Sequence, residues 1–254
     1  MLNVIAHGEA TGAPPLVIAH GLFGSARNWG AIARGLSDLR QVLAVDMRNH
    51  GQSFHDDRHD YPAMAGDLAG VIDANGGRAA VLGHSMGGKA AMMLALTRPD
   101  TVERLIVADM APVAYAHDQM EPLRAMRAVD LSAVTTRRDA DRQLAAHLSD
   151  PGLRAFLLHS LDVAGRQWRL NLPALEANMP AILGWPAVEG RYDGPALFLS
   201  GAESAYVRAE NRATITDLFP AARFARIPRA GHWLHADRPE AVTEALRTAL
   251  TADA

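Results

Sequence analysis

AAVLGHSMGGKAAMMLAL, residues 79–96, is the stretch of sequence that decides the fold. Its apolar start, residues 79–82, predicts a buried strand, and residues 89–96 predict a helix directly after it. Between them, residues 83–87 fit the pattern G-x-S-x-G, in which a serine occupies a sharp turn from strand to helix. Ser85 is therefore expected at a helix N-terminus, where unpaired N–H groups and the helix dipole face developing negative charge.

The rest of the chain repeats the alternation of strand and helix. Apolar runs that predict strands lie at residues 16–20, 41–46, 105–109, 196–200 and 223–227. Strands joined by crossover helices form a mostly parallel sheet, so we expect an α/β fold with a central sheet flanked by helices.

The alternation stops between residues 112 and 190. Helical patterns at residues 120–129, 137–148 and 153–161 fill this stretch, and no strand is predicted in it. We expect a helical cap inserted into an α/β core made of residues 1–111 and 191–254. The alternative is three ordinary crossover helices of the same sheet.

The composition excludes several classes of function. The 25 basic and 28 acidic residues nearly balance, and no cluster of Lys and Arg favours a nucleic-acid partner. The sequence has no cysteine, which excludes a thiolate nucleophile and a zinc–thiolate site. No apolar run approaches the length of a membrane span, so we expect no membrane partner and a cytoplasmic location. A monomer and a homodimer both remain open.

A serine hydroxyl needs a neighbouring base to act as a nucleophile. His232 lies in the loop before the last predicted helix and is expected above the carboxyl end of the sheet. His235, three residues further on, is the alternative base. The N–H of Met86, which follows the nucleophile, and that of Leu22, in the loop after an early strand, are expected to form the oxyanion hole. Phe23 is the alternative to Leu22.

Two alternatives lack this chemistry. His55 and His59 have the i, i+4 spacing of a metal pair on a helix, but Pro62 follows closely and no glutamate base lies between them. We therefore expect no metal site. A non-catalytic binding protein on this fold would be expected to lack a catalytic residue, and none is missing here.

Four motifs carry a resemblance to a known family. Residues 20–25 (HGLFGS), 46–53 (DMRNHGQS), 83–88 (GHSMGG) and 231–232 (GH) resemble those of the α/β-hydrolase superfamily. With residues 28–29, Lys89 and residues 108–113, they are similar to the YbfF-type bacterial esterases. The resemblance implies hydrolysis of short esters and acyl-CoA thioesters, a small-molecule ester or thioester substrate and no cofactor. The same scaffold also supports lyases, carbon–carbon bond hydrolases and cofactor-free peroxidases.

The acid of the expected triad departs from the superfamily pattern. Most members place it three residues beyond the glycine that follows the corresponding strand, here Gly201 after residues 196–200, and Ser204 occupies that position. Because serine cannot carry the charge that orients a histidine, we expect Asp109, at the end of the preceding strand, with Glu203 as the alternative. The acyl pocket is expected to be walled by six side chains: Phe23, Asn28 and Trp29 on one side, and Trp185, Tyr206 and His159 on the other.

Overall fold

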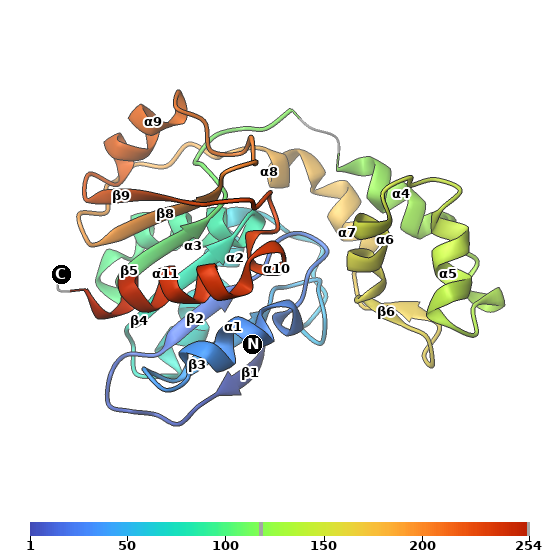
Figure 1. Ribbon diagram of the computed structural model, residues 1–254, viewed down its shortest axis with the longest axis horizontal. Helices are drawn as coiled ribbons and strands as arrows, with labels where there is room; N and C mark the ends of the chain where they lie inside the picture. Colours follow the sequence, from blue (N-terminus) through green and yellow to red (C-terminus); the bar gives the residue numbers. More distant parts are fainter. Residues whose placement is uncertain (117–118, 253–254) are drawn as a thin grey trace.

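A seven-stranded sheet forms the core of the computed structural model, which describes residues 1–116 and 119–252 (Figure 1). One edge strand runs antiparallel to its neighbour, and all other neighbouring pairs are parallel. The predicted mostly parallel α/β sheet is thereby confirmed. Across the sheet the strands are β1 (Asn3–His7), β3 (Val42–Asp46), β2 (Leu16–Ala19), β4 (Ala79–His84), β5 (Val102–Ala108), β8 (Ala196–Gly201) and β9 (Ala222–Ile227).

Helices cover both faces of the sheet, because successive side chains of a strand point to opposite faces. Along β2, Leu16 and Ile18 belong to one buried cluster, while Val17 and Ala19 belong to another. The first cluster packs under α1 (Gly30–Leu36) and α11 (Pro239–Thr251), and the second under α2 (Tyr61–Asp73), α3 (Met86–Thr97) and α9 (Asn211–Leu218). Short helical turns are η1 (Ala26–Trp29), η2 (Pro99–Thr101) and α10 (Leu234–Asp237).

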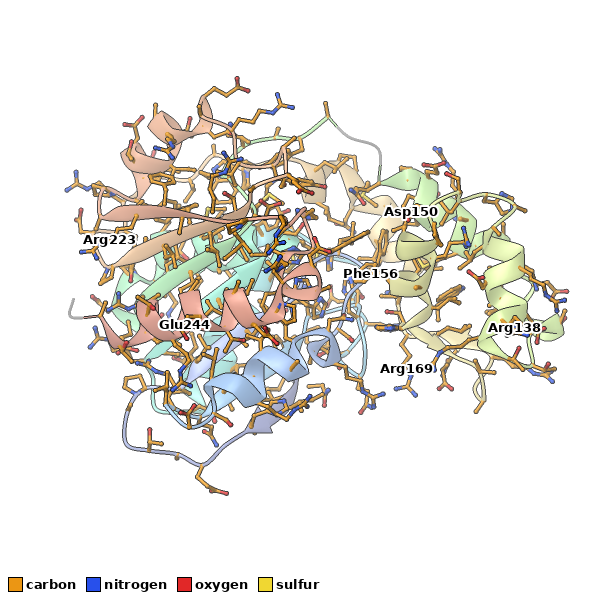
Figure 2. All side chains as sticks on the ribbon, in the orientation of Figure 1. Arg138, Asp150, Phe156, Arg169, Arg223 and Glu244 are labelled. Carbon is orange, nitrogen blue, oxygen red and sulfur yellow. The ribbon has the colours of Figure 1, made fainter. Side chains whose placement is uncertain are left out.

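The segment between β5 and β8 forms a group of helices beside the sheet, and we call this segment the cap (Figure 1). Arg138 lies on the far side of this group and Phe156 on the side that faces the core (Figure 2). A two-stranded hairpin, β6 (Leu161–Asp162) with β7 (Gln167–Trp168), also occurs here. The prediction that residues 112–190 contain no strand was wrong. The helical elements are α4 (Met120–Ala128), η3 (Leu131–Ala133), α5 (Arg137–Leu144), α6 (Pro151–Leu158), α7 (Leu172–Ala177) and α8 (Met179–Leu183).

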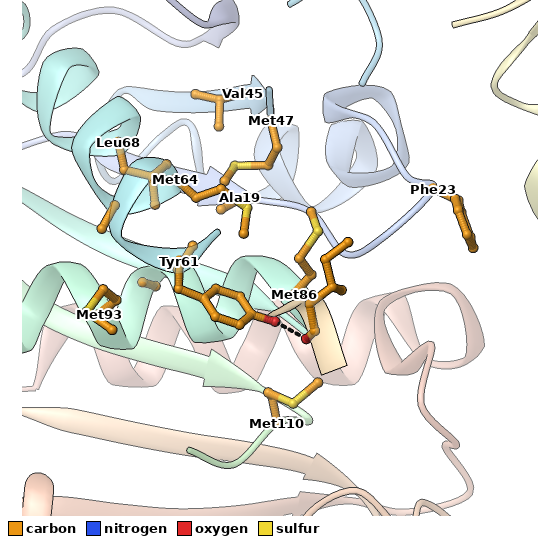
Figure 3. Packing of buried hydrophobic residues seen from close by; sticks show 14 of the residues in the cluster. Ala19, Phe23, Val45, Met47, Tyr61, Met64, Leu68, Met86, Met93 and Met110 are labelled. Atoms are coloured by element: carbon orange, nitrogen blue, oxygen red, sulfur yellow. Dashed lines mark hydrogen bonds between the residues drawn. The ribbon is translucent and has the colours of Figure 1, made fainter. Parts of the chain in front are cut away.

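The end of α8 is fixed to the core by buried polar side chains. Figure 3 shows Tyr61 lying among methionine side chains, with its hydroxyl donating a hydrogen bond to the carbonyl of Ile182. The ammonium of Lys89 donates to the carbonyls of Leu183 (3.0 Å) and Gly184 (2.6 Å). Lys89 lies on α3, one turn after Ser85, so the helix that carries the serine also holds the cap.

Lys89 is expected to make stability depend on pH above neutrality. Burial lowers the pKa of Lys89 to about 7, whereas an unfolded lysine titrates near 10.4. Between these values the unfolded chain binds the extra proton, so the free energy of unfolding should rise with pH, by up to about 1.4 kcal/mol per pH unit. Urea unfolding at pH 7.5 and 9.5 measures this rise.

The matched control is Lys89→Met, which keeps much of the aliphatic stem and should show no such rise. Because Lys89 is the only lysine in the sequence, protein grown with ¹³C-lysine gives one Cε signal whose titration reads its pKa directly. A midpoint near 10 would contradict this account.

Candidate active site

Ser85 lies in a tight turn between β4 and α3. Its backbone has φ 54° and ψ −120°, a sparsely populated conformation for a residue with a side chain. The turn needs glycine on both sides, since a Cβ on Gly83 would lie 2.2 Å from the carbonyl oxygen of Gly87. A Cβ on Gly87 would lie 2.4 Å from the oxygen of Ala19. Close packing of β4, α3 and β2 thus aims the hydroxyl away from the sheet.

The structure brings Ser85, His232 and Asp109 together from three distant parts of the chain. His232 Nδ1 lies 2.7 Å from Oδ2 of Asp109, and its Nε2 lies 3.0 Å from Oγ of Ser85. Since an ionised carboxylate only accepts, Nδ1 donates, and Nε2 is left to accept the serine proton. Asp109 is fully buried and holds φ 52°, while its N–H donates to Leu199 of β8.

The two alternative residues lie elsewhere. Glu203 is exposed, and its backbone N–H donates to the carbonyl of Ala230. His235 is buried and stacks on Trp29, with ring centroids 4.3 Å apart and planes 17° apart. Burial lowers the pKa of His235 to about 3, which keeps the ring neutral. Neither residue contacts Ser85 among the interactions of the described chain.

The loop after β2 presents backbone N–H groups beside Ser85. The N–H of Phe23 donates to Nε2 of His50 (3.1 Å), whose Nδ1 donates to the carbonyl of Arg48 (2.8 Å). Burial holds the pKa of His50 well below its usual value, so this ring stays an acceptor. The N–H of Phe23 is therefore occupied, whereas none of the loop and side-chain hydrogen bonds found within residues 1–116 and 119–252 is donated by the N–H of Leu22 or Met86.

The carboxylate of Asp46 stabilises the loops after β2 and β3 through backbone hydrogen bonds. One carboxylate oxygen accepts from the N–H of Ala26 and the other from the N–H of Gln52, at 2.8 and 2.9 Å. Gly51 packs directly on this carboxylate, because a Cβ on it would lie 2.2 Å from Cγ of Asp46. The motif at residues 46–53 thus serves to fix the loop that carries Leu22.

A cavity of about 410 Å³ opens above Ser85 between the core and the cap. Four of the six predicted wall residues line it: Phe23, Asn28, Trp29 and Tyr206. The prediction for Trp185 and His159 was wrong. Trp185 packs on Tyr61 (6.1 Å between rings), and His159 lies in a separate small crevice with a ring nitrogen 3.2 Å from Nδ2 of Asn28.

Several lining residues were missed by sequence reasoning. Leu153 and Phe156 project from α6, and Trp233 follows His232 directly. The rings of Phe156 and Trp233 meet with centroids 5.3 Å apart, which joins the cap to the loop that carries His232. The spacing of Leu153 and Phe156 on one helix face was the available signal, but it could not tell a face toward the cavity from one toward the interior of the cap.

His55 and His59 do not form a metal-binding pair. Residues 54–60 precede α2 and are not helical, so His55 and His59 do not share a helix face. His59 is buried, with its ring nitrogens 3.2 Å from Nδ2 of Asn49 and 3.3 Å from the sulfur of Met86. In the part of the chain that the structure describes, no three His, Asp or Glu side chains gather as metal ligands. No helix within that part is long and apolar enough to cross a membrane.

Comparisons with known proteins agree with this architecture. Residues 14–239 match the family described as α/β hydrolase fold. The esterase YbfF of Escherichia coli is 43% identical over 237 residues, which cover 92% of this chain and 91% of that protein. The mouse sn-1-specific diacylglycerol lipase ABHD11 is 42% identical, covering 96% of this chain and 82% of the lipase.

Solved structures show the same fold. A marine microorganism esterase superposes with a TM-score of 0.92 at 36% identity, covering 97% of this chain and 98% of that one. The enol-lactonase from Burkholderia xenovorans, at 22% identity and a TM-score of 0.75, shares the fold, with 99% of this chain and 96% of that one covered. The chain belongs to the α/β-hydrolase fold family, among its YbfF-type esterases.

Proposed function

We propose that this hydrolase cleaves small or medium acyl esters through an acyl-enzyme on Ser85. The observation that carries the proposal is the continuous line of hydrogen bonds from Ser85 through His232 to the buried Asp109. A hydroxyl, a neutral imidazole and a carboxylate in this order form the arrangement that activates a serine for acyl transfer.

In the first half of the reaction, Oγ of Ser85 attacks the acyl carbonyl while Nε2 of His232 takes its proton. The N–H groups of Met86 and Leu22 hold the oxyanion, each contributing on the order of a hundredfold to a thousandfold in rate. Asp109 keeps Nδ1 protonated and stabilises the imidazolium that forms. His232 then gives its proton to the leaving alcohol or thiol.

In the second half, His232 takes a proton from water, and the hydroxide attacks the acyl-enzyme. The same two N–H groups stabilise the second oxyanion, and the proton returns to Oγ of Ser85 as the acid leaves. Each step uses only side chains and backbone groups of this chain. The proposed reaction therefore requires neither a metal nor an organic cofactor.

The cavity favours an apolar acyl group. Leu153, Phe156 and Trp233 supply apolar walls, and its volume lies within the range of small-molecule sites. One relative is named an esterase and another a diacylglycerol lipase, so both act on carboxylic esters by name. We propose carboxylic esters as the substrates, with acyl-CoA thioesters as a second group that the same acyl-enzyme chemistry would accept.

A fluorophosphonate probe tests the proposal, because it labels only an activated serine. We expect labelling at Ser85, none in Ser85→Ala, and turnover that varies along an acyl-chain series of 4-nitrophenyl esters. Turnover of CoA thioesters of the same acids, measured in parallel, shows whether the enzyme also accepts acyl-CoA thioesters. Absent ester turnover combined with bromide-dependent peroxidation would replace the proposal with a peroxidase.

A further inference from the structure

The segment after β8 contacts the proposed triad through two residues, Ser204 and Tyr206. Oγ of Ser204 donates to Oδ2 of Asp109 at 2.5 Å, and this is the oxygen that also accepts from His232. The N–H of Tyr206 donates to the same Oγ at 3.2 Å. Because the hydroxyl oxygen accepts this hydrogen bond from Tyr206, its own proton is left to donate to Asp109.

The carboxylate of Asp109 is thereby held at both oxygens. Oδ1 accepts from the N–H of Gly201 at 3.2 Å, while Oδ2 accepts from Ser204 and His232. A fully buried carboxylate is stable only when its oxygens are hydrogen-bonded. Without the Ser204 hydroxyl, Oδ2 loses one of its two donors, and only Gly201 and His232 hold the carboxylate plane.

Tyr206 holds the other partner of this hydrogen bond. Its ring lies against His232 with centroids 3.7 Å apart and planes 12° apart, while His84 faces the histidine with a centroid distance of 4.8 Å. The backbone of Tyr206 is itself fixed, since its carbonyl accepts from the hydroxyl of Tyr115 at 2.8 Å. That hydroxyl also accepts from the N–H of Ala111, two residues beyond Asp109.

We propose that Ser204 and Tyr206 are positioning residues of the triad. Ser204 fixes the carboxylate of Asp109, and Tyr206 fixes the imidazole plane of His232. The hydrogen bond from the N–H of Tyr206 to Oγ of Ser204 couples these two contacts. The inference rests on the triad proposed above. Ser204 and Tyr206 contact Asp109 and His232 rather than the attacking hydroxyl of Ser85. They therefore act on the geometry on which proton transfer depends.

Ser204→Ala tests the first contact. Hydrogen bonds to charged groups are among the stronger ones, so we expect kcat for a 4-nitrophenyl ester to fall at least about tenfold, with KM within about twofold. Ser204→Thr retains the hydroxyl and should recover most of kcat. Equal kcat in Ser204→Ala and the unchanged enzyme would overturn the assignment of Ser204.

The pair Tyr206→Leu and Tyr206→Phe tests the second contact. Phenylalanine keeps the ring against His232 and should keep most of kcat, whereas leucine removes the ring and should lower kcat several-fold. Since Tyr206 also lines the cavity, KM is measured separately, and a loss confined to KM in Tyr206→Leu would overturn its positioning function.

A double-mutant cycle separates positioning from general damage to the fold. In an Asp109→Asn background, Ser204→Ala should cause little further loss in the rate of fluorophosphonate labelling, because both changes act on one hydrogen-bonded unit. Independent, additive losses would overturn the inference while leaving the triad intact. Full activity of Asp109→Asn itself would instead refute the proposed triad, so the two failures are distinguishable.

Discussion

Asp109→Asn should lower kcat by about four orders of magnitude while leaving the protein folded. The amide has the size of the carboxylate, but it carries no charge to stabilise the imidazolium of His232. Its NH₂ group also favours the wrong tautomer, in which Nδ1 accepts and Nε2 can no longer take the proton of Ser85. Steady-state kinetics with a 4-nitrophenyl ester, together with thermal unfolding, measures both parts of this expectation.

Glu203→Gln is the matched control, because it makes the same chemical change at the exposed neighbouring carboxylate. We expect its kcat to stay within about twofold of the unchanged enzyme. The opposite ranking, with a severe loss in Glu203→Gln and a mild one in Asp109→Asn, would mean that His232 turns toward Glu203 during the reaction.

The sheet was predictable because its central strands are buried on both faces. Such strands appear in the sequence as short continuous apolar runs, as in residues 79–82 and 196–200. Strand β1 was missed because it lies at the edge, is mostly half-exposed, and pairs antiparallel with β3. The hairpin β6–β7 was missed because two-residue strands show no periodicity; it depends on tertiary contacts such as the hydrogen bond from the Trp168 indole to the Met126 carbonyl (2.9 Å).

The proposed catalytic residues could be placed from the sequence because each lies where a parallel strand ends or a helix begins. Ser85 and Asp109 directly follow β4 and β5, which are neighbouring parallel strands whose last residues, His84 and Ala108, are paired. What the sequence does not contain is the orientation of side chains in the cap. Trp185 and Phe156 are both aromatic residues of the insertion, yet only Phe156 lines the cavity, since Trp185 packs on Tyr61 instead.

Acid is expected to unfold the protein well above the pH at which its carboxylates titrate. Burial lowers the pKa of the five buried histidines, to about 4 for His59 and about 3 for His235; the others are His20, His50 and His84. An unfolded histidine titrates near 6.5, so below that pH the unfolded chain binds more protons than the folded one. The free energy of unfolding should therefore fall as pH falls from 6.5 toward 4.5.

The slope of this fall is the quantity to measure. Each extra proton bound by the unfolded chain contributes about 1.4 kcal/mol per pH unit, so five histidines together contribute at most about 7 kcal/mol per unit. This upper limit is large against the usual stability of about 5–15 kcal/mol, so we expect the chain to unfold in mildly acidic solution. His235→Phe keeps an aromatic ring against Trp29 and removes one titrating group, so urea unfolding between pH 4.5 and 6.5 should show a slope lower by about one proton. Identical slopes in the two proteins would show that His235 is already charged in the folded state, which its stack on Trp29 and its burial argue against.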